Sequence, residues 1–160
     1  MASWEEIEAE APELAGRVRA GFDAHRHKLL ATLRRDGSPR ISGIETTFAD
    51  GELWLGMMPG SRKALDLRRD PRLALHSVSL DPPDDPTTWR GDAKLSGRAV
   101  EVDDPALKER VAGGGGQPDE SHLFRVDITE VVHTRIGDPP DHLVIELWRP
   151  DQDVRRMERR

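Results

Sequence analysis

Two Asp-Gly pairs, at residues 36–37 and 50–51, are the feature of the sequence that most restricts its fold. Each pair separates two short apolar runs, and Asp-Gly between such runs is a strong signal for a tight β-hairpin turn. The three runs cover residues 29–35, 39–49 and 52–58. They predict an antiparallel meander. A doubly wound parallel sheet is excluded, because it requires a long helix after nearly every strand.

The remaining segments predict further strands with short helices between them. Ser3 and Glu6 form a capping-box pattern for a helix that runs to Glu10, and Pro12 begins a second helix with an apolar stripe. A short helix is predicted after Gly60, with inward-facing side chains and a stop at Pro71. The stripe of the second helix consists of Leu14, Val18 and Phe22, and the inward-facing residues of the third helix are Ala64, Leu65 and Leu67.

Strands are also predicted at residues 72–80, 93–102, 122–136 and 142–150, the last two being the final strands of the chain. A helix over 105–112 and a mobile glycine-rich loop over 113–118 lie between them. About seven strands with few helices predict a mainly β, α+β fold, a closed or split antiparallel β-barrel, and the family resemblance described below implies the split type. We expect one domain over 1–160, with N-terminal helices in 1–24, the barrel in 27–149 and a C-terminal tail in 150–160.

Composition restricts the partners and the compartment. The net charge of −6 disfavours non-specific binding to nucleic acid, and no window is apolar enough to span a membrane. Without cysteine or a signal-peptide pattern, a cytoplasmic location is expected. Because 34% of the residues are charged, few apolar side chains remain to form a barrel core within a single chain, so a homodimer is expected.

The most informative chemical motif is Gly-Ser-Arg-Lys at residues 60–63, where the third strand gives way to a helix. A hydroxyl, a guanidinium, an ammonium and the free amides of a helix N-terminus all donate to phosphate. The alternative interpretation is that Ser61 only caps the helix while Arg62 and Lys63 are solvated. No pattern for a metal site was found among the six histidines, so none is expected.

The segment from residue 27 to 78 resembles the core of the pyridoxamine 5'-phosphate oxidase-like, FMN-binding split-barrel family. The resemblance rests on Pro-x-x-Ser at 39–42, Ser-Arg-Lys at 61–63 and Arg-Arg-Asp-Pro-Arg at 68–72. It implies a homodimer that holds a flavin-type cofactor between its subunits. The residues implied for cofactor binding are Ser61, Arg62 and Lys63 at the phosphate, Arg40, Ser42 and Ile44 along one side, and Gly56 and Met57 near the ring. Trp148 or Trp89 either covers the ring from the other subunit or packs in the core.

The resemblance implies an oxidoreductase that transfers hydride or electrons to a small organic substrate. FMN and the deazaflavin coenzyme F420 are equally good candidates, because both carry the ring, the ribityl chain and the first phosphate. Arg40, Arg68, Arg69 and Arg72 offer positive charge for the carboxylate tail of a deazaflavin. Glu45-Thr46-Thr47 replaces a basic residue of the vitamin-processing branch, so pyridoxamine phosphate is a poor candidate substrate. The alternative is a flavin- or haem-binding protein without turnover, and no catalytic acid or base is assigned.

Overall fold

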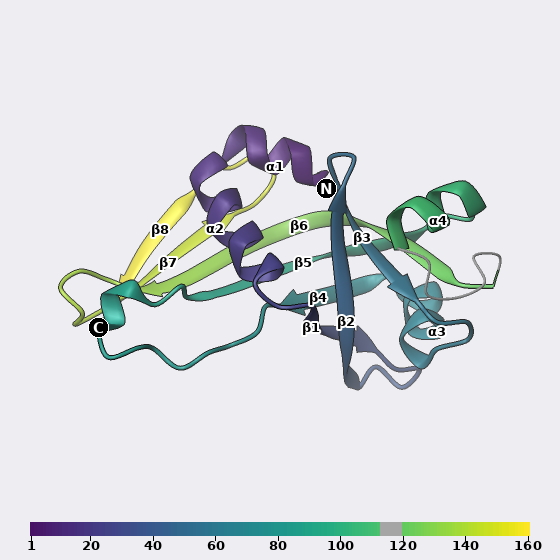
Figure 1. Ribbon diagram of the computed structural model, residues 1–160, viewed down its shortest axis with the longest axis horizontal. Coiled ribbons are helices and arrows are strands. Elements are labelled where there is room, and N and C mark those ends of the chain that lie inside the picture. The colour runs from purple at the N-terminus through teal and green to yellow at the C-terminus, as the bar shows by residue number, and fades with distance from the viewer. Residues whose placement is uncertain (113–119) are drawn as a thin grey trace.

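The computed structural model describes residues 1–112 and 120–160, and more of these residues lie in strands than in helices (Figure 1). The predicted glycine-rich loop at 113–118 lies outside these residues. The helices are α1 (Trp4–Glu10), α2 (Pro12–Asp23), α3 (Arg62–Arg69), the short 3₁₀ helix η1 (Pro86–Thr88) and α4 (Pro105–Ala112). The strands are β1 (His27–Leu33), β2 (Pro39–Ala49), β3 (Glu52–Met57), β4 (Arg72–His76), β5 (Asp92–Glu101), β6 (His122–Ile136), β7 (Leu143–Trp148) and β8 (Arg155–Arg159).

Six antiparallel strands close into a barrel. The sheet runs in the order β3-β2-β1-β4-β5-β6-β7-β8, and an additional pairing of β3 with β6 closes the ring. Strand β2 serves two neighbours in turn, since residues 39–45 pair with β1 and residues 46–49 pair with β3. Strands β7 and β8 extend the sheet beyond the closed ring, so the predicted mainly β, split-barrel fold is confirmed.

The predicted hairpin turns are present on both sides of β2. Asp50 and Gly51 adopt positive φ angles of 54° and 74°, as both central residues of a type I′ turn must. Gly37 also has a positive φ, 82°, in the β1–β2 turn. These two turns fix the meander of β1, β2 and β3 that leads directly into α3.

Helices α1 and α2 cover one side of the barrel and contribute to its core (Figure 1). The capping box at Ser3 and Glu6 is formed in both directions, which begins α1 as predicted. The stripe of Leu14, Val18 and Phe22 is buried to 2% exposure or less. These side chains join the barrel's inward residues in a single apolar cluster.

Two expectations need correction. The segment predicted as a tail contains an eighth strand, β8, which pairs with β7 from Arg155 to Arg159. Only Met157 of that strand is apolar, so it lacks the alternation that identifies a strand in sequence. Leu65 does not face inward: it is 42% exposed, because in α3 the buried face is formed by Ala64 and Leu67 together with Asp66.

Candidate functional site

The loop over residues 58–61 joins the end of β3 to the start of α3. We call it the phosphate loop, after the ligand group that the sequence analysis predicts for it. Gly60 has a φ of +64°, and a side chain at this position would project into open space. Ser61 is the N-cap residue of α3, yet its side chain makes no capping hydrogen bond. Its Oγ is buried and has no hydrogen-bond partner among the described residues. A buried hydroxyl without a partner is costly, so the Oγ would gain a hydrogen bond if it turned outward to a ligand.

The two cations that follow Ser61 take different positions. Lys63 reaches across to β2, where its Nζ donates a hydrogen bond to the carbonyl oxygen of Gly43. Burial lowers the pKa of Lys63, because desolvation disfavours the charged ammonium. Arg62 is exposed and makes no hydrogen bond or ion pair within the described part of the chain. The start of α3 therefore gathers a free hydroxyl, a free guanidinium and a partly desolvated ammonium.

A polar chain lies beneath the phosphate loop. The backbone N–H of Gly60 donates to Nε2 of His122 at 3.1 Å, and the other ring nitrogen of His122 lies 2.8 Å from Glu101 Oε1. Glu101 is held in turn by Arg68 of α3 through two hydrogen bonds of 2.7 and 2.8 Å. The hydrogen bonds from Arg68 are the main cause of the lowered pKa of Glu101. The loop is thus tied to β5, β6 and α3.

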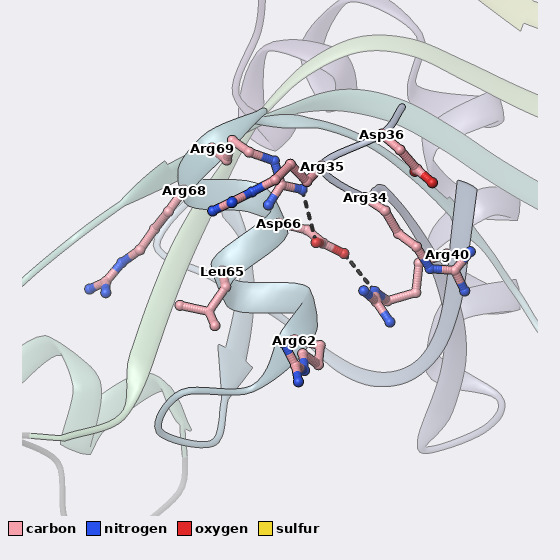
Figure 2. Close-up of a pocket in the computed structure, with 9 residues that line it drawn as sticks. All are labelled: Arg34, Arg35, Asp36, Arg40, Arg62, Leu65, Asp66, Arg68 and Arg69. Carbon is pink, nitrogen blue, oxygen red and sulfur yellow. Dashed lines mark hydrogen bonds and ion pairs between the residues drawn. The ribbon is translucent and has the colours of Figure 1, made fainter. Parts of the chain in front are cut away.

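A positively charged hollow of about 950 Å³ lies beside α3 (Figure 2). We call it the arginine pocket. Its walls are the β1–β2 turn, the start of β2 and one face of α3, and they carry six arginines against two aspartates. The lining residues are Arg34, Arg35, Asp36, Arg40, Arg62, Leu65, Asp66, Arg68 and Arg69. In a chain with a net charge of −6, this concentration of positive charge favours an anionic ligand.

Asp66 fixes the geometry of the arginine pocket from below. Its buried carboxylate accepts hydrogen bonds from Arg40 Nε at 2.6 Å, from Arg69 Nη2 at 3.0 Å and from Thr32 Oγ1 at 2.9 Å. Burial raises its pKa, but the hydrogen bonds from Arg40, Arg69 and Thr32 outweigh this effect and lower the pKa below its ordinary value. Figure 2 shows Arg40 and Arg69 converging on this one carboxylate from β2 and α3.

The structure brings only some of the predicted site residues together. Arg40 and Arg62 line the arginine pocket, and Ser61 and Lys63 lie at the start of α3. Ser42 is half-buried on the same face of β2 as Arg40, and Gly56 is half-buried near the end of β3. The side chains of Ile44 and Met57 are only 3% and 5% exposed and belong to the barrel core.

The two candidate tryptophans lie elsewhere. Trp148 is 1% exposed in the apolar core of this chain, where its Nε1 donates to Glu10 of α1. Its ring therefore offers no face to a surface ligand, and the packing interpretation is the one that the structure supports for this residue. Trp89 is half-buried, with its Nε1 bonded to the carbonyl oxygen of Leu80. It lines a smaller hollow between α2 and the loop after β4.

Sequence reasoning missed the residues that organise the site from a distance. Asp66, Glu101 and His122 were not identified, and neither were Arg34 and Arg35 in the β1–β2 turn. Asp66 had one local signal, an acid three residues before Arg69 on the same helix. Glu101 and His122 are 21 residues apart in sequence, and only the pairing of β5 with β6 brings them together.

Residues 14–135 match the pyridoxamine 5'-phosphate oxidase family. The match covers the barrel from α2 through β6, including the phosphate loop and α3. The chain belongs to this family. A search of curated proteins finds no match.

Solved structures show the same fold as this member of the pyridoxamine 5'-phosphate oxidase family. General stress protein 26 from Bacillus anthracis is 15% identical with a TM-score of 0.58, covering 74% of this chain and 91% of its own. A nimC/nimA family protein from Clostridium acetobutylicum is 11% identical with a TM-score of 0.61, covering 96% and 98%. A candidate 5-nitroimidazole antibiotic resistance protein from Bacteroides thetaiotaomicron is 10% identical with a TM-score of 0.59, covering 72% and 80%.

In residues 1–112 and 120–160, no three His, Asp or Glu side chains gather as a set of metal ligands. No helix in these ranges is long and apolar enough to cross a membrane.

Proposed function

We propose that this family member is an oxidoreductase that binds a flavin-type cofactor, with the cofactor phosphate at the start of α3. The observation that carries the proposal is the buried, unpartnered Oγ of Ser61 at a helix N-terminus, next to Arg62 and Lys63. A hydroxyl, two cations and free helix amides suit a phosphate dianion, and the open space at Gly60 leaves the approach clear.

Ser61, Lys63 and Arg62 would each make a different contact with the cofactor phosphate. Ser61 Oγ would donate to one phosphate oxygen, and Lys63 Nζ would turn from the Gly43 carbonyl or share its protons with the phosphate. Arg62 would close the site from the solvent side. A bound flavin or deazaflavin supplies the hydride chemistry itself, so the protein's task is orientation and electrostatics. No residue is assigned here as a general acid or base.

FMN and the deazaflavin coenzyme F420 remain the two candidate cofactors. They share the phosphate, so the phosphate loop does not separate them. The arginine pocket continues from Arg62 away from the loop, and it suits the carboxylate tail of a deazaflavin. Arg40, Arg68 and Arg69 lie in this pocket as the tail hypothesis requires, whereas Arg72 lies outside its lining and pairs with Asp70.

The phosphate site is tested by alanine substitution of its two cations. Arg62→Ala and Lys63→Ala should each weaken cofactor binding by roughly 10- to 100-fold, the loss of one charge-assisted hydrogen bond. Titration calorimetry with FMN and with deazaflavin measures the change. Arg149→Ala, which removes an arginine bonded to Glu130 on β6, is the matched control and should bind as the wild type does. Unaltered affinity in both Arg62→Ala and Lys63→Ala would refute the site.

A binding protein without turnover is the second candidate, and it predicts a different result. Such a protein would take up the cofactor and show its bound spectrum, yet the bound cofactor would not exchange hydride with any of a panel of reductants and small organic acceptors. Stopped-flow spectra of the loaded protein separate the two candidates. The same spectra, recorded with haem, test the haem-binding form of this alternative.

A further inference from the structure

The polar chain beneath the phosphate loop has a role that the proposed phosphate contacts do not explain. We propose that His122, oriented by Glu101, is a positioning residue that holds the phosphate loop in its binding conformation and thereby selects phosphate-bearing ligands. The inference rests on the proposed phosphate site, because it concerns the loop that forms that site. It adds two residues from β5 and β6 that contact no ligand themselves.

The hydrogen-bond directions determine the tautomer of His122. The N–H of Gly60 has only a proton to offer, so Nε2 of His122 must accept and carries no proton. The proton of the neutral ring is therefore on Nδ1, where it is donated to Glu101 Oε1 at 2.8 Å. A carboxylate bonded to one ring nitrogen fixes both the tautomer and the ring orientation. Glu101 thus keeps His122 in the form that accepts from the loop.

The ring of His122 has little freedom to move. Its side chain is 8% exposed, and it lies nearly parallel to the ring of Phe124, with ring centroids 6.2 Å apart and an interplanar angle of 25°. Its backbone pairs with Met57, three residues before Gly60. Glu101 is equally constrained, because Arg68 holds both of its carboxylate oxygens. The acceptor for Gly60 is therefore set in place before any ligand arrives.

The residue that His122 holds is Gly60, whose backbone conformation sets the shape of the phosphate loop. Gly60 has a φ of +64°, a conformation that turns the chain sharply into α3 and leaves Ser61 extended with its Oγ unpartnered. Without the bond to His122, Gly60 would have a free N–H and wide conformational freedom. Ordering it on binding would then oppose affinity. A preformed loop avoids that cost only for ligands that use the loop, which are those with a phosphate.

Comparison of FMN with riboflavin isolates this effect, since riboflavin lacks the phosphate but keeps the ring and the ribityl chain. We expect His122→Ala to weaken FMN binding by about 5- to 10-fold, as for one lost hydrogen bond, and to leave riboflavin binding unchanged. His122→Gln keeps an acceptor and should restore FMN affinity to within about twofold of wild type. His133→Ala, which removes another buried histidine far from the loop and bonded to Arg90, is the control and should leave the ratio of the two affinities unaltered.

A second measurement uses the protein without cofactor. In ¹⁵N spectra, His122 should show a protonated Nδ1 and an unprotonated Nε2, and the Gly60 amide should exchange faster with solvent in His122→Ala than in wild type or His122→Gln. Equal losses of FMN and riboflavin affinity in His122→Ala, or an Nε2-protonated ring in the wild type, would overturn the inference. A wild type that binds FMN no better than riboflavin would instead overturn the proposed phosphate site. If the wild type prefers FMN over riboflavin but His122→Ala shows the same ratio of the two affinities, only the role of His122 is refuted.

Discussion

Asp66 is the residue on which the arginine pocket depends. Its carboxylate is 5% exposed and compensates two arginines at once, one from β2 and one from its own helix. Removal of such a partner leaves Arg40 and Arg69 without the buried counter-charge that they share. The pocket's shape and the attachment of α3 to the barrel therefore share one carboxylate.

Asp66→Asn should lower the free energy of unfolding by about 1.5 to 3 kcal/mol, the worth of a hydrogen bond to a charged group. Urea denaturation at neutral pH measures the change. Asp23→Asn is the matched control, because Asp23 pairs with Arg19 on the exposed side of α2 and should contribute about 0 to 1 kcal/mol. Equal effects of the two substitutions would show that Asp66 has no special role in stability.

The pH dependence of that difference follows from the pKa of Asp66, which lies below its ordinary value of 3.8 in the folded protein. A carboxyl whose folded pKa is lowered contributes stability that is complete above the unfolded pKa and is lost as the pH falls through the folded pKa. The gap between wild type and Asp66→Asn should thus be constant at neutral pH and shrink below the ordinary value. A gap that persists unchanged to strongly acidic pH would contradict this.

Individual residues that act together with their neighbours in the sequence could be predicted, whereas residues that act on distant parts of the chain were missed. Ser61, Arg62 and Lys63 are adjacent, and their phosphate chemistry is visible in the motif itself. The use of His122 as an acceptor for Gly60 depends on the pairing of β3 with β6 across 62 residues. Ile44 and Met57 came from the resemblance, which gives positions along a strand but not the face that each side chain occupies.

Helix α3 connects the two proposed anion-binding features, the phosphate loop and the arginine pocket, in only eight residues. Its first turn provides the phosphate loop's hydroxyl and cations, and its remaining length provides one wall of the arginine pocket. The opposite wall is the β1–β2 turn, where Arg35 makes no hydrogen bond or ion pair within the described residues. Arg68 and Arg69 are already paired with the carboxylates of Glu101 and Asp66. The arginines of the β1–β2 turn have no such ion pair within the described residues, so their charges are more accessible to a ligand.

The double variant Arg34→Ala, Arg35→Ala tests whether the pocket holds a carboxylate tail. Deazaflavin affinity should fall by roughly 10-fold or more in this variant and should also fall steeply as salt is added, since exposed charges are screened. FMN affinity should respond much less to both. Equal affinities for the two cofactors at low salt, both indifferent to the double substitution, would remove the case for deazaflavin and leave FMN as the better assignment.

Elements with a strong local signal were predictable, and the rest were not. The two N-terminal helices have a capping box, a proline start and an apolar stripe, and the hairpins have Asp-Gly turns. Strand β8 has none of these signals, because it obtains its structure from β7 and not from its own residues. The closure of the ring by β3 and β6 likewise depends on a pairing that no turn in the sequence announces.

The outer face of β1 and β2 carries large apolar side chains that no other part of the described chain covers. Leu29 and Ile41 are 51% and 71% exposed, and strand pairing places both on the side of the barrel wall that faces away from the core. Met58, at the phosphate loop, is 77% exposed. We propose that this face forms the subunit contact of a homodimer, which would bring a second copy close to the phosphate loop.

Light scattering at micromolar concentration should give twice the mass of the chain, and the double variant Leu29→Glu, Ile41→Glu should give a monomer, because it places like charges in an apolar contact. Val154→Glu, at a 39% exposed residue outside this face, should leave the mass unaltered. A monomeric wild type with cofactor bound would refute the proposal. So would a double variant that is still dimeric.

Ring closure also determines which strand edge is left open for non-specific association with other copies of the chain. Among the described strands, β8 alone pairs with a single other strand, so one whole edge of β8 presents backbone donors and acceptors without a strand partner. Four of its five side chains are charged, namely Arg155, Arg156, Glu158 and Arg159. Charged side chains along an edge strand oppose the addition of another strand. The same residues that concealed β8 from sequence analysis thus protect the barrel from growing by strand addition into an aggregate.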